Sequence, residues 1–534
     1  MKKLLSWLDN YLITLIAGFL LIFLPLYPKW PLFDILPGYN VRVRLEDVLI
    51  LSTVIYFFIQ VIRKKIKLKQ APLLKPMFIY IVIGLLSTIS AIFITKTIYP
   101  EYIQIAKVFL HWFRRIEYFS LFFIFFFALK KPSQITKFLP LLFLAVLGIS
   151  VYGFGQKYLY WPAYSTMNRE FSKGIALYLT EHARVLSTFG GHFDLAAYIM
   201  LTIIPLIIIG FLHKNALIRT LALILSLVEY WLLILTASRT SWVGYIIALI
   251  IAFTLLFLKK KPFWVISRWF TVTALSVFIM ISFGDMSERF GHIFKLEGVK
   301  AFLTSPFKAP PEDGIPMDSS LTPEEQLNII ATKTDIPPTP AKDGQAPAKD
   351  RQKPADVYYD PYPELQAYLA TKTGETINTS YSANALKYGL SAGIRLDTLW
   401  PNAIKALKTN PLLGTGYSTL VKEHVWEFTV AESTDNDYLR LLGETGILGL
   451  ISFLAIFVII LKTLFIAFKQ TNNPLYYGLF SSGIAITIGL LVNALYIDVF
   501  EASKVAYGYW SIIGLILALA ILIIKPKQHV KKNR

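Results

Sequence analysis

The chain is divided by about twelve apolar segments, each close to the length that a helix needs to cross a lipid bilayer. A hydrocarbon core of about 30 Å takes about 20 apolar residues in a helix. With 55% hydrophobic residues and a mean hydropathy of +0.54, the chain is too apolar for a soluble protein. The sequence therefore predicts an all-α polytopic membrane protein with about 12 transmembrane helices. These segments lie near 8–26, 46–62, 76–95, 108–129, 138–156, 195–212, 217–236, 240–258, 263–283, 443–468, 475–497 and 505–524.

Lysine and arginine gather in every second loop between these segments. Basic residues mark the cytoplasmic side of a membrane protein, so both termini are predicted to be cytoplasmic. The same loops account for much of the net charge of +19, and no nucleic-acid-binding signature accompanies it. We therefore expect the lipid bilayer, and no nucleic acid, as a partner. The basic sites include Lys2, Lys3, residues 63–69, Lys130, Lys131, Lys214, residues 259–261, Lys469 and residues 525–534.

The other loops are predicted to be extracytoplasmic. The longest, 284–442, separates nine helices in 1–283 from three in 443–534. Its middle, 305–356, is rich in Pro, Lys, Asp, Ala and Thr, a composition typical of disorder. Residues 357–442 carry aromatic residues and helical stretches, which predict an ordered cap on the outer face. The remaining outer loops are 27–45, 96–107, 157–194, 237–239 and 498–504.

The sequence argues against several kinds of chemistry. Without cysteine, the chain has no thiolate nucleophile and no cysteine-based metal site. The seven histidines are scattered, without a pair at helical spacing backed by carboxylates. No P-loop or dinucleotide-binding fingerprint is present. We therefore expect no metal and no cofactor, and a transfer reaction on the outer face must use a donor that is already activated.

Two arginines lie at the predicted outer ends of membrane helices. Arg184 precedes the Gly190–Gly191 pair and the sixth segment, and Arg239 lies in a very short turn between the seventh and eighth. Either side chain can reach lipid headgroups by snorkelling. Alternatively, a guanidinium at this position can clamp a phosphate through paired hydrogen bonds.

The end of the long loop carries a second set of motifs. Arg395 and Trp400 lie on a predicted amphipathic helix. Gly414 and Gly416 follow in a Pro/Gly turn, for which a simple chain reversal is a sufficient interpretation.

Residues 433–449 run from a polar helix start directly into an apolar span. Asn436, Arg440 and Glu444 are spaced four apart and share one helix face. An asparagine N-cap and an Arg–Glu pair explain them structurally, and a functional role is compatible with that. Polar side chains where a helix leaves the bilayer cost free energy unless they have partners or a function.

Charged residues also interrupt the fourth segment. Arg114 and Arg115 are flanked by apolar helix on both sides, so they either snorkel or face a polar cavity. Asp498 and Glu501 form a further acidic pair at the turn between the last two segments.

Taken in order, these motifs resemble those of the bacterial O-antigen ligase and O-antigen polymerase superfamily. They cover about residues 184–450, whereas the first five segments are matched only by general hydropathy. The matching residues are Arg184…Phe189-Gly190, Ser238-Arg239…Trp242, Arg395…Trp400, Pro411-Leu-Leu-Gly414-Thr-Gly416 and Asp435-Asn-Asp-Tyr-Leu…Glu444-Thr-Gly446.

The resemblance implies a GT-C-like fold and a glycosyltransferase of the bacterial inner (plasma) membrane. Such enzymes transfer an undecaprenyl-diphosphate-linked glycan to a hydroxyl of a glycan or lipid acceptor on the outer face. We expect inversion at the sugar, without a metal or a nucleotide sugar. Arg184, Arg239 and Arg395 would stabilise the leaving diphosphate. Arg114 and Arg115 are further candidates for binding it.

The general base for the acceptor hydroxyl is expected at Asp435, where ligases of this family carry histidine. A carboxylate can take this role when arginines favour its ionised form. The aspartate favours a polymerase over a ligase. His424 and Glu432 are alternative bases, and Glu444 is expected to orient an arginine. The supporting residues are then Asn436, Arg440, Gly414, Gly416 and Trp400.

Other functions stay open at this point. Transfer to protein hydroxyls, as by a protein O-oligosaccharyltransferase, belongs to the same superfamily. A transporter or flippase for polyprenyl-linked saccharide would show inverted repeats and charges near mid-membrane, and neither is evident in the sequence. A scaffold that displays 305–356 would need this insertion for its function.

Overall fold

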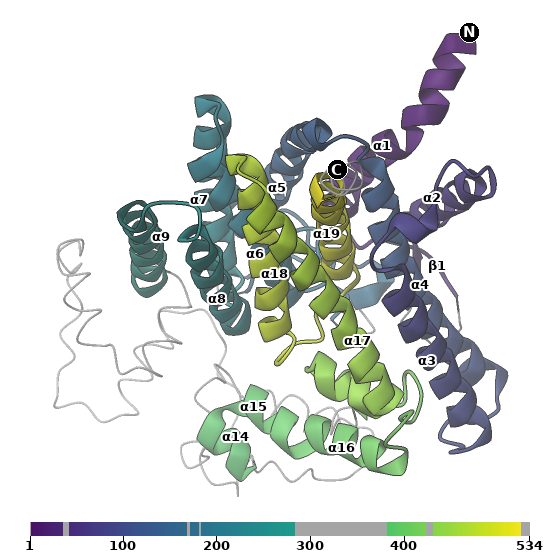
Figure 1. The fold of residues 1–534 in the computed structure, drawn as a ribbon. Helices are drawn as coiled ribbons and strands as arrows, with labels where there is room; N and C mark the ends of the chain where they lie inside the picture. Colours follow the sequence, from purple (N-terminus) through teal and green to yellow (C-terminus); the bar gives the residue numbers. More distant parts are fainter. Residues whose placement is uncertain are drawn as a thin grey trace, which may run out of the picture. The chain divides into compact units, whose positions relative to one another are not determined.

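The computed structural model describes residues 2–35, 42–167, 171–180, 183–283, 382–422 and 431–524. The predicted disorder of 305–356 and the first part of the predicted cap, up to residue 381, lie outside these ranges. Long helices dominate the described part (Figure 1). They are α1 (Lys2–Leu26), α2 (Leu45–Ile62), α3 (Leu74–Phe93), α4 (Tyr102–Ala128), α5 (Ile135–Tyr158), α6 (His192–Leu212), α7 (Ala216–Leu235), α8 (Arg239–Leu256), α9 (Pro262–Ser282), α17 (Asp437–Gln470), α18 (Pro474–Asn493) and α19 (Ser503–Ile524).

Every predicted segment coincides largely with one of these helices, and 10 helices in the described ranges are long and apolar enough to cross a membrane. The prediction of a mainly helical membrane protein is thereby confirmed, but the count of twelve is not. The apolar part of α1, Tyr11–Leu26, is shorter than the ten. Helix α4 carries Arg114, Arg115 and Glu117 within its length.

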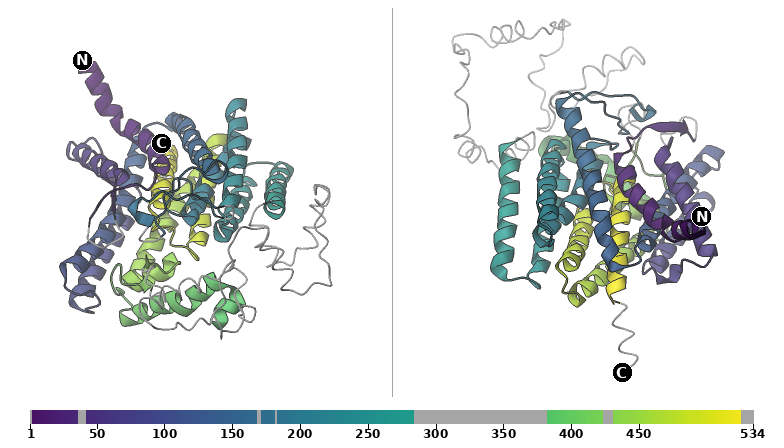
Figure 2. Two further views of the ribbon diagram at one scale, coloured as in Figure 1. Left: turned by 180° about the vertical axis from the view of Figure 1, so that it is seen from behind. Right: turned by 90° about the horizontal axis from the view of Figure 1, so that it is seen from above.

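Helix α6 forms the centre of the helix packing. It is apolar around its whole circumference, which is the pattern of a helix buried on all sides. It packs against α7, α8, α18 and α19, and α19 also packs against α4. Figure 2 shows the yellow helix α19 among helices from the first half of the chain in both views.

The chain divides into two compact units, Met1–Met286 with Arg395–Arg534, and Ser287–Ile394. The second unit contains α14 (Ala383–Tyr388) and α15 (Leu390–Ile394). The π-helical turn Arg395–Leu399 and α16 (Trp400–Thr409) belong to the first unit, where α16 packs on α17. Short antiparallel pairs join β1 (Pro31–Asp34) to β2 (Arg42–Arg44) and β3 (Val421–Lys422) to β4 (Ala431–Glu432).

Contacts between loops follow the predicted alternation of faces. On the predicted outer side, Lys504 Nζ donates to the carbonyls of Tyr27 (2.5 Å) and Thr188 (2.7 Å), which lie in two different outer loops. On the predicted cytoplasmic side, Lys259 Nζ donates to the carbonyl of Thr471 (3.0 Å). Loops predicted to share a face therefore contact one another, while the assignment of each face stays a prediction.

Candidate active site

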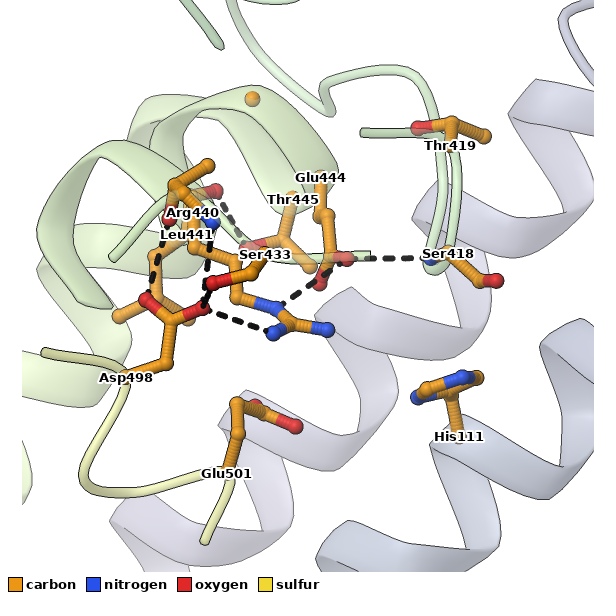
Figure 3. A network of polar contacts seen from close by, with 12 residues as sticks. His111, Ser418, Thr419, Ser433, Arg440, Leu441, Glu444, Thr445, Asp498 and Glu501 are labelled. Atoms are coloured by element: carbon orange, nitrogen blue, oxygen red, sulfur yellow. Dashed lines mark hydrogen bonds and ion pairs between the residues drawn. The ribbon is translucent and has the colours of Figure 1, made fainter. Parts of the chain in front are cut away.

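The loop before α17 is held by one carboxylate, Asp498 (Figure 3). Its oxygens accept hydrogen bonds from the backbone N–H groups of Asn436 (2.7 Å) and Thr434 (3.2 Å). Arg440 Nη1 lies 3.0 Å from Asp498 Oδ2. These contacts fix the backbone on both sides of Asp435, which takes a left-handed φ of 49°.

The predicted N-cap and ion pair of α17 are both present. Asn436 Oδ1 accepts a hydrogen bond from the Leu439 N–H at 3.0 Å, and Arg440 Nε lies 3.3 Å from Glu444 Oε1. Figure 3 shows Arg440 between Asp498 and Glu444. The side chain of Glu444 is only 1% exposed, so this pair is buried and its partners cannot be replaced by water without cost.

Arg115 extends this ionic network from α4. Its Nη2 lies 2.5 Å from Glu501 Oε1 and 3.5 Å from Glu444 Oε2, and its guanidinium stacks 4.3 Å from the ring centre of Tyr417. Of the two alternatives for Arg115, the structure therefore shows buried polar surroundings rather than snorkelling. Burial raises the pKa of Glu501, but Arg115 and then Arg440 lower it more, so its net pKa lies below the ordinary value.

The Pro/Gly turn 411–416 clamps a break in α17. At Gly446 the helix is interrupted, with φ 67° and ψ −169°. The Ile447 N–H donates to the Pro411 carbonyl (2.9 Å), and the Gly416 N–H donates to the Glu444 carbonyl (2.9 Å). Gly414 also has a positive φ, and a Cβ there would lie 2.5 Å from a backbone oxygen of α17. The turn therefore positions the helix segment that carries Glu444.

Gly446→Ala is expected to destabilise the protein by at least about 1–3 kcal/mol, the range for a residue forced into such a conformation. A Cβ at Gly446 would also lie 2.3 Å from the Leu412 carbonyl carbon. The measurement is thermal unfolding of the purified protein in detergent. Gly18→Ala is the control, because the nearest atom to its Cβ is the end of a flexible leucine side chain at 3.0 Å. Equal melting temperatures for the two variants would contradict the role assigned to the break.

Asp435 is held between an arginine and a serine. Arg395 Nη2 lies 2.9 Å from its Oδ2, and Ser433 Oγ donates to its Oδ1 at 2.7 Å. The Arg395 guanidinium stacks 4.2 Å from the ring centre of Tyr496, whose other neighbour is the edge-on ring of Trp400 at 6.2 Å. The sequence predicted that arginines favour the ionised form of this aspartate, and Arg395 is the arginine in direct contact with it.

The carboxylates of this region differ in their access to a ligand. The side chain of Asp435 is 30% exposed, against 10% for Asp498 and 1% for Glu444. The buried carboxylates are occupied by backbone N–H groups and arginines, as described above. Asp435 is therefore the carboxylate best placed to meet a hydroxyl group from outside the protein.

Arg184 and Arg239 do not contact Asp435 directly. Other packed segments connect them to this region. The N–H of Val185 donates to the Leu235 carbonyl (3.2 Å), which places Arg184 beside the end of α7. Arg184 Nη1 lies 2.8 Å from His192 Nε2. Arg239 begins α8 two residues before Ser241, whose hydroxyl accepts a hydrogen bond from Asn493.

Asn493 ends α18 immediately before the segment that contacts Asn436 and Arg395. The next residue, Ala494, accepts a hydrogen bond from the Asp437 N–H at 2.9 Å. The half-buried Arg239 forms no ion pair with any residue in the described ranges. Arg395 is thus in direct contact with Asp435, whereas Arg184 and Arg239 are joined to it only through intervening segments.

Arg114 lies in a different set of contacts from its neighbour Arg115. Its Nη1 lies 2.7 Å from Asp47 Oδ1, 2.9 Å from Glu117 Oε2 and 3.2 Å from the Tyr507 hydroxyl. Like Arg115, it faces polar groups.

Two alternative bases and the acidic pair at the last turn complete the comparison with the sequence. His424 lies outside the described residues, and for Glu432 only the backbone pairing with Val421 is described. Asp498 and Glu501 were recognised as an acidic pair at a tight turn, but nothing in the sequence indicated what they hold. Among the described residues, no group of three His, Asp or Glu side chains is arranged to hold a metal ion.

The fold and the site define a multi-pass membrane protein with a buried ionic network at the start of one helix. Residues 366–454 match the model of the O-antigen ligase family (Wzy_C). This match includes Arg395, Asp435 and Glu444, and it confirms the resemblance to the O-antigen ligase and polymerase superfamily. The match supports an O-antigen ligase- or polymerase-like membrane function. No curated protein sequence matches the chain.

Proposed function

We propose that this protein is a metal-independent, inverting glycosyltransferase that polymerises or ligates a glycan carried on undecaprenyl diphosphate. The observation that carries the proposal is the partly exposed Asp435, paired with Arg395 at 2.9 Å inside the segment that matches the O-antigen ligase family. A carboxylate accepts a proton and an arginine stabilises a departing phosphate, so the pair combines the two groups that such a transfer requires.

The reaction is a single displacement at the anomeric carbon. The acceptor hydroxyl oxygen forms the new bond to this carbon as Asp435 takes its proton. The bond from the carbon to the donor phosphate oxygen breaks, and the electron pair leaves with the undecaprenyl diphosphate. Attack from the side opposite the leaving group inverts the configuration, and Arg395, Arg239 and Arg184 stabilise the charge that develops on the diphosphate.

The ionic network supports these groups without touching the substrate in our proposal. Glu444 and Asp498 hold Arg440 and the loop that carries Asp435, and Trp400 packs on the tyrosine under Arg395. The donor and acceptor lie on the extracytoplasmic side of the bacterial plasma membrane, with both termini in the cytoplasm. The aspartate in place of the ligase histidine favours polymerisation over ligation.

Arg239→Ala is expected to lower the turnover number of glycan transfer by roughly 10²–10³-fold, the effect of removing one preorganised donor to developing charge. Arg239→Lys should also lose activity, because an ammonium does not reproduce the paired hydrogen bonds of a guanidinium. The assay is transfer from an undecaprenyl-diphosphate-linked glycan by the full-length protein in detergent, with the stereochemistry of the product determined by NMR.

Arg268→Ala is the matched control, because Arg268 is also partly buried but stacks on Trp264 of the same helix α9. It should transfer at the wild-type rate. Wild-type protein that forms no glycosidic product from any lipid-linked donor would refute the proposed function. Retained activity in Arg239→Ala would remove this arginine from the site.

A further inference from the structure

An apolar groove lies between α2 and α4. Its volume is about 360 Å³. Two of its lining side chains are largely exposed, Leu51 at 61% and Phe113 at 56%, so it is open along the side of the helix bundle. Its apolar lining includes Ile50, Leu51, Val54, Leu110, Phe113 and Ile116.

A second pocket of about 210 Å³, with several charged side chains in its lining, adjoins this groove. Leu110 and Arg114 line both cavities, so the groove and the pocket are adjacent at these two residues. The pocket is lined by residues of three predicted outer loops and of the middle of α4. Its charged and titratable lining consists of Lys29, Arg44, His111, Arg114, Tyr118, Asp194 and Glu501.

Most cations near this pocket already have an acidic partner. Lys29 Nζ lies 2.5 Å from Glu46 Oε1, and Arg114 is paired with the carboxylate of Asp47. Arg44 differs: it is only 7% exposed, and its Nε has no hydrogen-bond partner in the described ranges. No ion pair to a described residue balances its charge. An unpaired buried guanidinium is costly unless a ligand supplies the anion.

We infer that the groove and pocket together bind a polyprenyl diphosphate, with the prenyl chain in the groove and the diphosphate against Arg44 and Arg114. A guanidinium binds phosphate oxygens through paired, charge-assisted hydrogen bonds. The open apolar groove provides lipid-facing surface for a chain that stays at the level of the bilayer. This inference rests on the proposed function, because it identifies where the donor lipid of that reaction first binds, before its diphosphate reaches Arg395, Arg239 and Arg184.

The position of the pocket relative to Asp435 favours the donor over an ordinary phospholipid. Glu501 lines the pocket, and its N–H donates to the Asp498 carbonyl at 3.3 Å. Asp498 in turn holds the loop that carries Asp435. A diphosphate in this pocket is therefore adjacent to Glu501, which lies in the same turn as Asp498, the residue that holds the Asp435 loop.

Binding of farnesyl diphosphate to the full-length protein in detergent tests this inference, with farnesol and inorganic diphosphate as separate probes. Arg44→Gln should weaken farnesyl diphosphate at least about tenfold, the scale of a lost charge-assisted hydrogen bond, and leave farnesol unchanged. Leu51→Trp fills the groove, so it should weaken both prenyl probes and leave inorganic diphosphate unchanged. Phosphatidylglycerol should not displace the farnesyl diphosphate.

Two variants serve as matched controls and should bind as the wild type does. Ile55→Trp changes a residue 55% exposed on the same helix but outside the groove lining, and Arg63→Gln changes an arginine at the far end of α2. Wild-type affinity in both Arg44→Gln and Leu51→Trp overturns the inference, as does displacement by phosphatidylglycerol. Because Leu51 is exposed, its variant remains informative if Arg44→Gln does not fold.

The outcome is separable from that of the proposed function. If the wild type binds farnesyl diphosphate with this pattern of variants but transfers no glycan, the binding site stands and the proposed reaction fails. If glycan transfer occurs and both groove and pocket variants turn over at the wild-type rate, the reaction stands and this site fails.

Discussion

Asp435→Asn is expected to reduce the turnover number of glycan transfer by about 10²–10⁴-fold, the contribution of a positioned general base. The amide has nearly the same shape and can still accept the hydrogen bond from Ser433 Oγ, now 2.7 Å from Asp435 Oδ1. It cannot take the proton of the acceptor hydroxyl. The Michaelis constant for the lipid-linked donor should change little, since the donor is bound by arginines. Single-turnover kinetics with the purified variant measure the effect directly.

Asp397→Asn is the matched control for this prediction. Asp397 is an exposed carboxylate two residues after Arg395, in the same π-helical turn. It should transfer glycan at the wild-type rate. Both variants should melt within about 2 °C of the wild type, because about 1 kcal/mol shifts the melting temperature by only about 2–4 °C at 150–250 residues and by less in a longer chain. Wild-type turnover in Asp435→Asn would transfer the role of base to another residue, with His424 and Glu432 as the candidates to test next.

Glu444→Ala is expected to destabilise the protein by about 3–5 kcal/mol, the cost of removing one partner from a buried ion pair. The carboxylate faces Arg440 at 3.3 Å and Arg115 at 3.5 Å, and it also accepts the Ser418 N–H at 3.0 Å. Its removal takes one carboxylate partner from each of the two guanidinium groups. The buried N–H of Ser418 also loses its hydrogen bond to this side chain. Thermal unfolding in detergent, followed by light scattering and by tryptophan fluorescence, reports the loss.

The control for this variant is Asp9→Ala. Asp9 also faces two cations, Arg63 and Lys65, but all three side chains are substantially exposed to solvent. Ion pairs in such surroundings contribute little to stability, so the melting temperature should remain close to that of the wild type. If the two alanine variants melt together, the network around Glu444 does not stabilise the start of α17. Glu444→Gln should fall between them, because it keeps the hydrogen bond and loses the charge.

The course of the helices could be predicted from the sequence because the length and polarity of a membrane span are set by the bilayer. The local features of α17 could also be predicted, since an N-cap and an i,i+4 pair depend only on Asn436, Arg440 and Glu444. The break at Gly446 could not be predicted, because the residues that follow Gly446 are apolar and continue the helix. Only the backbone hydrogen bonds from residues 411–416 reveal why the helix tolerates it.

The partners of the site residues could be predicted only in part. The resemblance indicated that arginines lie near Asp435, but it did not indicate that Arg395 pairs with it. The hydrogen bonds from Thr434 and Asn436 to Asp498 join residues about 60 positions apart. Pairings across such a separation depend on how the helices pack, which no local pattern encodes. For the same reason, the sequence could not decide whether Arg115 reaches headgroups or carboxylates.

The hold of Asp498 on the Asp435 loop has a consequence for how the protein acquires its function. During synthesis the ribosome completes α4 and α17 before it makes Asp498 and Glu501. Arg115 and Arg440 therefore lack two of their carboxylate partners until the hairpin of α18 and α19 is made. The proposed base would then be fixed in place only when α18 and α19 have entered the membrane. A chain interrupted after α17 would carry every motif shared with the family and still be inactive.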